Sequence, residues 1–223
     1  MHPLISYVII IIIVFSLPLV AVRYGKQYLV ALMPIYIITA NVFAESFFKS
    51  FGVVQSLAVP IFCATFLVSN ILNELYGRHE ARRAVFVGFI GQLVFVILLI
   101  IIKNTDIFPD ALTKYETTFK IIPRLVAGSI VAYLASQLTD IALFHILKRR
   151  TGKKGLFTRN TVSTSISQFV DTTVLVYIAF YNTPLFASND ELWSFILSTW
   201  LFKICVALID YPFIWFATRS KTK

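Results

Sequence analysis

Charged side chains stand inside long stretches of this sequence that are otherwise apolar. Asp140, Asp171 and Asp210 each lie well inside such a stretch, and Lys203 lies near the middle of one. Inserting a charge into a membrane costs about 2.5–3.5 kcal/mol, so a charge kept there normally faces a partner or a polar cavity. A carboxylate can pair with an amine, bind a cation or accept N–H donors from a ligand. These four residues are therefore the first candidates for a functional site.

The stretch at about 122–147 carries its polar residues on one helical face. At 100° per residue, a stripe about 100° wide contains Ser129, Tyr133, Ser136, Gln137 and Asp140. Arg124 lies off this stripe, at the end of the stretch. Hydrogen bonds between membrane helices would explain the serines and Gln137. They explain Asp140 less well, because it lies roughly 10 Å from the helix end at 1.5 Å per residue.

Two later stretches, at about 161–181 and 191–217, hold charges at matching depths. Asp171 shares a face with Thr164 and Gln168, and Lys203 shares a face with Thr199 and Asp210. Counted from the helix ends, Asp171 and Lys203 lie at one level, which predicts an ion pair. The alternative to a functional role is that this pair only holds two helices together. Asp140 and Asp210 also match in depth, so one of them is expected to be protonated or bound to a cation.

Two polar groups in the first half of the chain are harder to interpret. Glu74 precedes Tyr76-Gly77, where an apolar stretch ends in Arg78, Arg82 and Arg83. Anchoring at the membrane surface explains the arginines. Glu74 is expected to face a central cavity, at the cytoplasmic mouth of that cavity. Asn41, Glu45 and Lys49 are spaced i, i+4, i+8 and would share one helical face, either in the site or as a local Glu–Lys pair.

The composition indicates a membrane protein. Of 223 residues, 58% are hydrophobic and only 14% are charged, and the mean hydropathy is +0.80. About 20 apolar residues are needed to span a bilayer. Seven stretches meet this length, at about 4–22, 28–48, 53–73, 84–102, 122–147, 161–181 and 191–217. We therefore expect an all-α polytopic membrane protein, a bundle of about seven transmembrane helices that forms one integral membrane domain over residues 1–223.

The basic residues predict how this bundle is oriented. With seven spans, 14 of the 20 Lys and Arg residues fall on one side of the membrane: Arg23, Lys26, Arg78, Arg82, Arg83, Lys148, Arg149, Arg150, Lys153, Lys154, Arg159, Arg219, Lys221 and Lys223. Cytoplasmic loops carry an excess of Lys and Arg. The pattern therefore places the N-terminus outside the cell and the C-terminus in the cytoplasm. The expected location is the cell (inner) membrane.

Signatures of enzymes and of nucleic-acid binding are lacking in the sequence. It contains no HExxH, no Gly-x-Ser-x-Gly and no Walker A motif, so we expect neither an enzyme nor a cofactor. No nucleic-acid-binding module is visible, in spite of the net charge of +9. A polar lining spread over several spans favours a transporter. A structural membrane subunit, whose charges serve only assembly, is the alternative from another class.

Three segments and two single residues, in this order along the chain, resemble one family. FLVSNILNELYGRHEARRAV, Arg124, SQLTDIALF and RNTVSTSISQFVDTTVLVYIAF, together with the late Lys203, resemble the queuosine precursor transporter family, also called the vitamin uptake transporter (VUT) family, over about 28–218. The matching positions are Glu74, Tyr76, Gly77, Ala81, Arg82, Gln137, Asp140, Asp171, Thr172 and Lys203. Asn70 departs from the pattern, since the family has an acidic residue there.

The resemblance implies import of 7-deazaguanine precursors of the tRNA nucleoside queuosine, such as preQ0, preQ1, queuine or queuosine. Carboxylates could accept the paired N–H donors of such a base, and Phe66, Tyr133 or Phe169 could stack on it. The expected substrate-binding residues are Asn41, Asn70, Glu74, Arg124, Tyr133, Gln137, Asp140, Gln168, Asp171 and Lys203, with Asp171, Lys203 and Asp210 as ion-pair or proton-coupling groups.

The expected partners are a purine-like base or nucleoside and the lipid bilayer, with a homo-oligomer left open. Two alternative transport functions stay open as well. One is transport of another vitamin-like solute, and the other is a vitamin-binding subunit that needs an ATPase partner.

Overall fold

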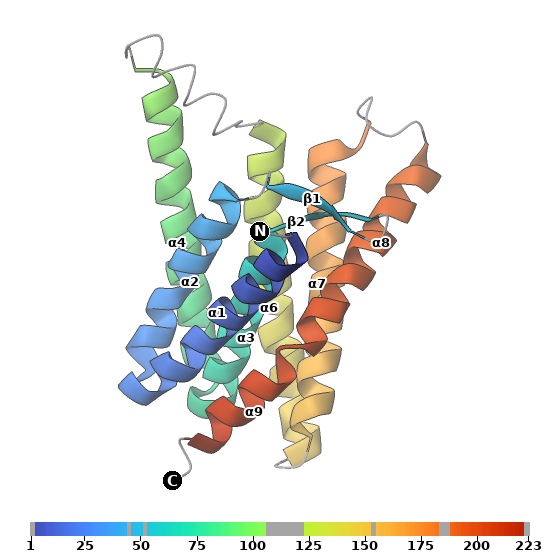
Figure 1. Ribbon diagram of the computed structural model, residues 1–223. Coiled ribbons are helices and arrows are strands. Elements are labelled where there is room, and N and C mark those ends of the chain that lie inside the picture. Colours follow the sequence, from blue (N-terminus) through green and yellow to red (C-terminus); the bar gives the residue numbers. More distant parts are fainter. Residues whose placement is uncertain are drawn as a thin grey trace.

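The protein is a bundle of long helices with one short β-hairpin (Figure 1). The computed structural model describes residues 3–43, 46–50, 53–105, 123–152, 155–182 and 188–220. The elements are α1 (Pro3–Tyr24), α2 (Lys26–Val42), β1 (Phe47–Ser50), β2 (Val53–Ser56), α3 (Ala58–Tyr76), α4 (Arg78–Lys103), α6 (Pro123–Thr151), α7 (Leu156–Phe180), α8 (Asn189–Leu208) and α9 (Tyr211–Ser220).

Most of the predicted spans are present as helices of membrane length. Five segments of the described chain are long and apolar enough to cross a bilayer: Ile5–Tyr24, Ala58–Tyr76, Arg78–Ile102, Ala127–Thr151 and Asn189–Arg219. The other two predicted spans correspond to α2, which has 17 residues, and α7, which carries a buried polar face. The expectation of a helical membrane bundle is therefore confirmed.

Helix α3 lies at the centre of the bundle. It contacts α1, α2, α4, α6, α8 and α9, and most of its residues are buried. Because protein surrounds α3 on all sides, it can carry the polar residues Thr65, Ser69, Asn70 and Asn73 away from lipid. Helices α6 and α7 pack side by side along their length, as the yellow and orange ribbons of Figure 1 show. Together these three helices supply most of the buried polar groups.

Helix α4 combines a lipid-facing side with a close approach to its neighbours. Large apolar residues such as Ile90, Val94 and Ile97 are exposed, as expected for a surface in contact with lipid tails. On the inner side, a Cβ on Gly88 would lie 2.6 Å from both Ile37 Cδ1 and the Tyr133 hydroxyl. Small residues of this kind let membrane helices pack closely.

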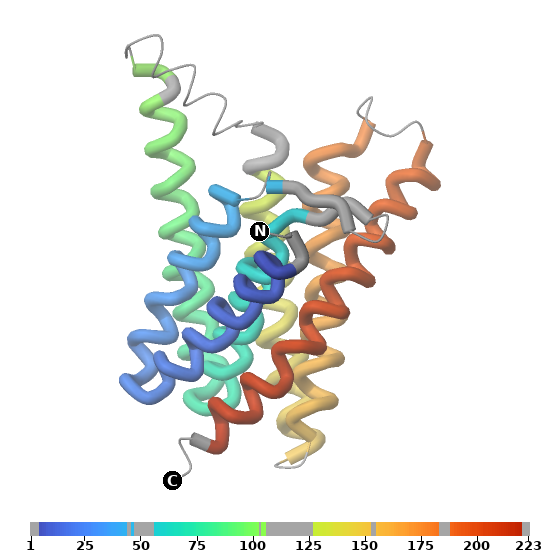
Figure 2. The backbone as a smooth tube through the Cα atoms, viewed as in Figure 1, coloured from blue at the N-terminus to red at the C-terminus, as the bar shows by residue number. Residues whose placement is uncertain are grey.

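Three tight turns lie at the same end of the bundle, the lower end in Figure 2. They join α1 to α2, α3 to α4 and α6 to α7, and they contain Gly25, Gly77 and Gly152, each with positive φ. Helix α9 also ends here (Figure 2). We call this the basic end, because Arg23, Arg78 and Arg149 lie beside these turns. The charge pattern thus grouped these turns correctly, although the structure does not show which side of the membrane they face.

Some of the predicted boundaries are wrong. The span expected at 28–48 ends at Val42, and the span expected at 53–73 begins only at Ala58, because Phe47–Ser50 pairs antiparallel with Val53–Ser56. Asn41 and Lys49 therefore do not share a helical face, and Glu45 lies outside the described residues. The last span is not one continuous helix but is interrupted at Ile209–Asp210.

Candidate functional site

Buried polar side chains gather where α3, α6 and α7 meet α8 and the start of α9. We call this group the polar core; its members are Thr65, Ser69, Asn70, Ser136, Gln137, Asp140, Asn160, Ser163, Thr164, Ser167, Gln168, Asp171, Thr172, Lys203 and Asp210. Taken as whole residues, backbone included, all are at most 7% exposed. So many buried polar groups cost stability unless they bond to one another or to a ligand.

An ion pair lies at one side of the polar core. Lys203 Nζ on α8 donates to Asp171 Oδ2 on α7 at 2.8 Å, and Ser136 Oγ on α6 donates to Asp171 Oδ1 at 3.2 Å. The ammonium also lies 5.6 Å from the centroid of the Phe62 ring. This is the contact that the matching depths of Asp171 and Lys203 predicted. Both oxygens of Asp171 are engaged, so the pair orients this carboxylate.

Asn70 on α3 is the centre of a hydrogen-bond relay. Its Nδ2 donates to Asn160 Oδ1 at 3.0 Å and to Thr164 Oγ1 at 3.1 Å. In one direction, Asn160 Nδ2 donates to Asp210 Oδ1 at 2.7 Å. In the other, Thr164 Oγ1 donates to Asp140 Oδ1 at 3.4 Å. Asn70 therefore links Asp140 and Asp210 through an amide with two donor hydrogens, which an acidic residue at this position could not supply.

Two glutamines complete the polar core. Gln137 Nε2 donates to Thr65 Oγ1 at 2.7 Å, and the Thr65 hydroxyl itself donates to the Phe62 carbonyl at 2.6 Å. Since Thr65 must accept from Gln137, the Gln137 amide is oriented with its oxygen away from Thr65. Gln168 Nε2 points at Cys63 Sγ, 3.8 Å away. Both glutamines thus direct their donors at α3.

The acceptors of the polar core are only partly used. Six buried oxygens of the polar core have no hydrogen-bond partner among the described residues: the hydroxyl oxygen Thr172 Oγ1 and the carbonyl or carboxylate oxygens Asn70 Oδ1, Gln137 Oε1, Asp140 Oδ2, Gln168 Oε1 and Asp210 Oδ2. The amide donors of the same side chains, by contrast, are engaged. A buried acceptor without a donor is costly, and such groups in a native protein call for a reason. The polar core is therefore suited to a ligand that brings several N–H or cationic donors.

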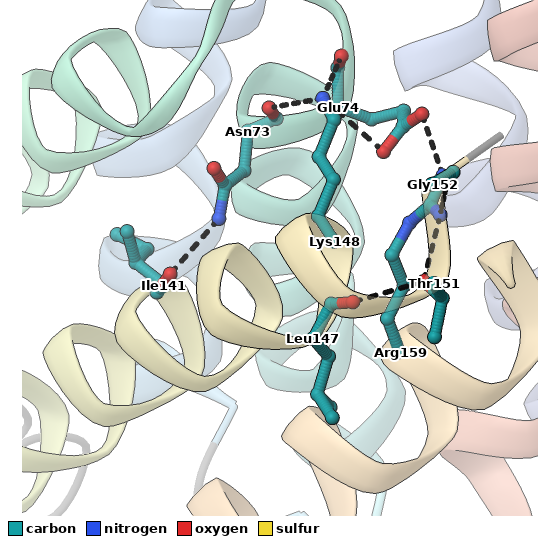
Figure 3. A network of polar contacts seen from close by, with 8 residues as sticks. All are labelled: Asn73, Glu74, Ile141, Leu147, Lys148, Thr151, Gly152 and Arg159. Carbon is teal, nitrogen blue, oxygen red and sulfur yellow. Dashed lines mark hydrogen bonds and ion pairs between the residues drawn. The ribbon is translucent and has the colours of Figure 1, made fainter.

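Glu74 belongs to a separate ionic cluster nearer the basic end (Figure 3). Its Oε1 accepts from Arg159 Nη2 at 2.6 Å, and its Oε2 lies 3.4 Å from Lys148 Nζ. Lys148 also donates to the Asn73 and Glu74 carbonyls at 3.2 and 2.6 Å, and Arg159 Nη1 donates to the Gly152 carbonyl at 2.8 Å. The cluster fastens the end of α3 to the α6–α7 turn.

Arg159 is a correction to the sequence interpretation. It was counted with the basic loop residues, yet α7 begins at Leu156 and Arg159 is 1% exposed. Its guanidinium lies over the Phe144 ring, 5.6 Å from the centroid, and is bonded to Glu74. A basic residue close to a predicted helix end looks the same in sequence whether it reaches the headgroups or turns inward.

The remaining candidates lie apart from the polar core. Tyr133 is buried, but its hydroxyl donates to the Val85 carbonyl of α4 at 3.1 Å. Asn41 is exposed near the end of α2 and donates to Ile37 O at 2.8 Å. Arg124 lies in the first turn of α6, and Phe169 packs edge-on against Trp200 with ring centroids 5.2 Å apart.

Asn160 and Ser167 were missed by sequence reasoning. The predicted span began at 161, so Asn160 fell outside it, although it lies on the same α7 face as Thr164, Ser167 and Asp171. Ser167 donates to Asp140 Oδ1 at 3.2 Å. The helical spacing of these four residues was the signal that could have found both.

A bundle of membrane-length helices around a buried polar core with charged groups is the architecture of a membrane transporter. Comparison with known proteins agrees, since residues 56–217 match the family model described as "Putative vitamin uptake transporter". The chain belongs to this vitamin uptake transporter family. Proteins named as queuosine precursor transporters are similar to it.

The similar proteins come from several bacteria. A "Probable queuosine precursor transporter" of Bacillus subtilis (strain 168) is 32% identical over 202 residues, which cover 88% of this chain and 86% of that protein. A protein of the same name from Haemophilus influenzae is 25% identical over 65% of this chain and 60% of its own length. The "Queuosine precursor transporter" of Escherichia coli (strain K12) is 22% identical over 66% and 64%. The comparison with solved structures finds no match.

Proposed function

We propose that this protein imports queuosine precursors across the cell membrane and holds the 7-deazaguanine base in the polar core. The observation that carries the proposal is the surplus of buried acceptors there, of which Asp140 Oδ2, Gln137 Oε1 and Gln168 Oε1 are three. A guanine-type edge brings a ring N–H and an exocyclic NH2 side by side. Such donors match a carboxylate and neighbouring amide oxygens, and would relieve the cost of leaving them without partners.

The individual groups have different roles in this proposal. Asp140, Gln137 and Gln168 contact the base, because each has one polar atom bonded to the protein and one acceptor left over. Lys203 pairs with Asp171 and orients its carboxylate. Glu74 acts at the basic end of the site through Arg159 and Lys148. With the basic end in the cytoplasm, the substrate would enter from the opposite end of the bundle and leave past Glu74.

Uptake in cells tests the proposal directly. The gene is expressed in a bacterial strain that can neither make nor import queuosine precursors, and queuosine in tRNA is measured after preQ0 or preQ1 is supplied. We expect the wild type to restore queuosine and Asp140→Asn to reduce the initial uptake rate at least tenfold. Asp190→Asn is the matched control, since Asp190 is exposed at the start of α8.

Competition experiments test the recognition step. A 7-deazapurine that lacks the 2-amino group should compete at least tenfold more weakly than the parent base, because it removes one donor from the predicted contact. Equal competition by both compounds, or failure of the wild type to restore queuosine at normal membrane abundance, would contradict the proposal.

A further inference from the structure

The break between α8 and α9 presents a buried carboxylate that recognition of a neutral base does not explain. Asp210 is 1% exposed, and its Oδ1 accepts from Asn160 Nδ2 at 2.7 Å. Its Oδ2 is buried and has no hydrogen-bond partner in the described part of the chain. Asp210 precedes α9, but the hydrogen bond described for its side chain goes to Asn160 on α7 instead of the first turn of α9. Capping of α9 is therefore not a sufficient reason for this residue.

The charges around Asp210 do not balance. Among the described residues, Lys203 is paired with Asp171 and Arg159 is paired with Glu74, while neither Asp140 nor Asp210 forms an ion pair. Asp140 and Asp210 are joined to each other by the Asn70 relay. Because both carboxylates are buried away from water, keeping them both ionised would be costly unless positive charge is supplied.

The surroundings of Asp210 favour a small cation. Asn160 on α7 contacts its carboxylate, and the titratable or charged groups near it on other elements are Asp140 on α6, Cys63 on α3 and the Lys203–Asp171 pair. The C-terminal end of α8, where the helix macrodipole is negative, and the N-terminal end of α9, where it is positive, meet at this break. Interrupted helices near the middle of the membrane are where many transporters place coupling ions. No three His, Cys, Asp or Glu side chains of the described ranges are grouped to hold a metal ion.

We propose that Asp210, linked to Asp140 through the Asn70 relay, takes up one monovalent cation, a proton or Na⁺, that is transported together with the substrate. The inference rests on the proposed function, since it assigns the driving force of the same transport. Occupation of Asp210 by a cation would neutralise one of the two like charges beside the base. Binding of the base at Asp140 would in turn change the affinity of Asp210 for the cation. That reciprocity is the requirement for coupled transport.

Reconstituted protein allows the coupling to be measured apart from transport itself. Purified full-length protein in liposomes is given labelled preQ0, which is neutral and therefore cannot supply the cation. Exchange between internal and external preQ0 reports the proposed function. Accumulation above equilibrium is then measured under an inward proton gradient, an inward Na⁺ gradient or neither. Under one of the two gradients, we expect the wild type to accumulate at least tenfold more preQ0 than it does without a gradient. The gradient that drives accumulation identifies the coupled ion.

The variant Asp210→Asn keeps the size of the side chain and an oxygen that accepts from Asn160. It should lose gradient-driven accumulation at least tenfold relative to its own exchange rate, whereas Asp190→Asn should behave like the wild type in both assays. Accumulation by Asp210→Asn at the wild-type level would overturn the proposal, as would parallel loss of exchange and accumulation in a folded variant. Exchange by the wild type without accumulation under either gradient would overturn the coupling but leave the proposed function standing.

A measurement on the wild type alone covers the case in which Asp210→Asn does not fold. Addition of preQ0 to vesicles loaded with a pH-sensitive or Na⁺-sensitive dye should produce a cation influx that rises with the amount of substrate taken up. Substrate influx with neither dye responding would refute the proposal.

Discussion

Replacement of Lys203 tests whether the buried Asp171 carboxylate needs a counter-charge for the protein to be stable. Lys203→Met leaves Asp171 with its hydrogen bond from Ser136 but without a counter-charge, in a place where the two side chains are 9% and 4% exposed. Removing one partner of a buried pair costs about 3–5 kcal/mol. At about 1.4 kcal/mol per factor of ten, that is about two to three and a half powers of ten in the ratio of folded to unfolded protein.

The surface pair Lys26–Glu80 is a matched control. Its nitrogen and oxygen are also 2.8 Å apart, but the Lys26 side chain is 44% exposed. Exposed pairs contribute little, because water and salt screen them and the side chains must be ordered. Lys26→Met should therefore leave the melting behaviour of the detergent-solubilised protein unchanged, while Lys203→Met should lower the temperature at which the monodisperse size-exclusion peak is lost by many degrees.

The double variant Asp171→Asn with Lys203→Met separates stability from function. It removes both charges and should restore the melting temperature and the membrane abundance toward wild type. If Asp171 also binds substrate, transport stays lost. Recovery of transport would show that the pair only holds α7 and α8 together, and would leave Asp140 and Gln137 to recognise the base. Equal melting temperatures for Lys203→Met and Lys26→Met would refute the burial argument itself.

Three further predictions concern other parts of the bundle. Arg159→Gln should lower the melting temperature clearly, whereas Arg78→Gln, at an exposed position, should not; equal effects would mean that the Glu74 cluster contributes nothing. Gly88→Val should reduce membrane abundance, because its Cβ would lie 2.6 Å from atoms of two neighbouring helices; unchanged abundance in a fluorescent fusion would show that α4 can move outward at little cost. With the native cysteines replaced, a membrane-impermeant thiol reagent added outside cells should label a cysteine at Asp190 but not one at Arg150, and the opposite result would invert the proposed orientation.

The features that could be predicted from sequence are those governed by the cost of a charge in lipid. Asp171 and Lys203 each required a partner, and their depths along consecutive spans indicated which one. The Asn70 relay could not be predicted in this way. It depends on how α3, α6 and α7 are rotated about their axes, and a neutral amide on an apolar helix gives no charge signal from which to infer its neighbours.

Boundaries between elements were predicted less well, for a physical reason. The apolar residues around Phe47–Ser56 suit a buried strand as well as a helix, and hydrophobicity alone does not distinguish short runs of the two. Helix α9 packs on α1 after the interruption, with the Phe15 and Phe213 rings edge-on and their centroids 5.5 Å apart. No local sequence pattern predicted the exposure of Asn41 or the interruption before α9.

The central position of α3 has a consequence for how the chain is made. It is much less hydrophobic than α4, so α3 is a weak membrane segment by itself. The groups that satisfy Asn70 lie 90 and 94 residues further along the chain, and those that satisfy Glu74 lie beyond residue 147. During synthesis α3 is therefore complete before the residues that partner its polar side chains have been made. Biogenesis of this protein should depend on the insertion machinery retaining α3 until the α6–α7 pair has been translated.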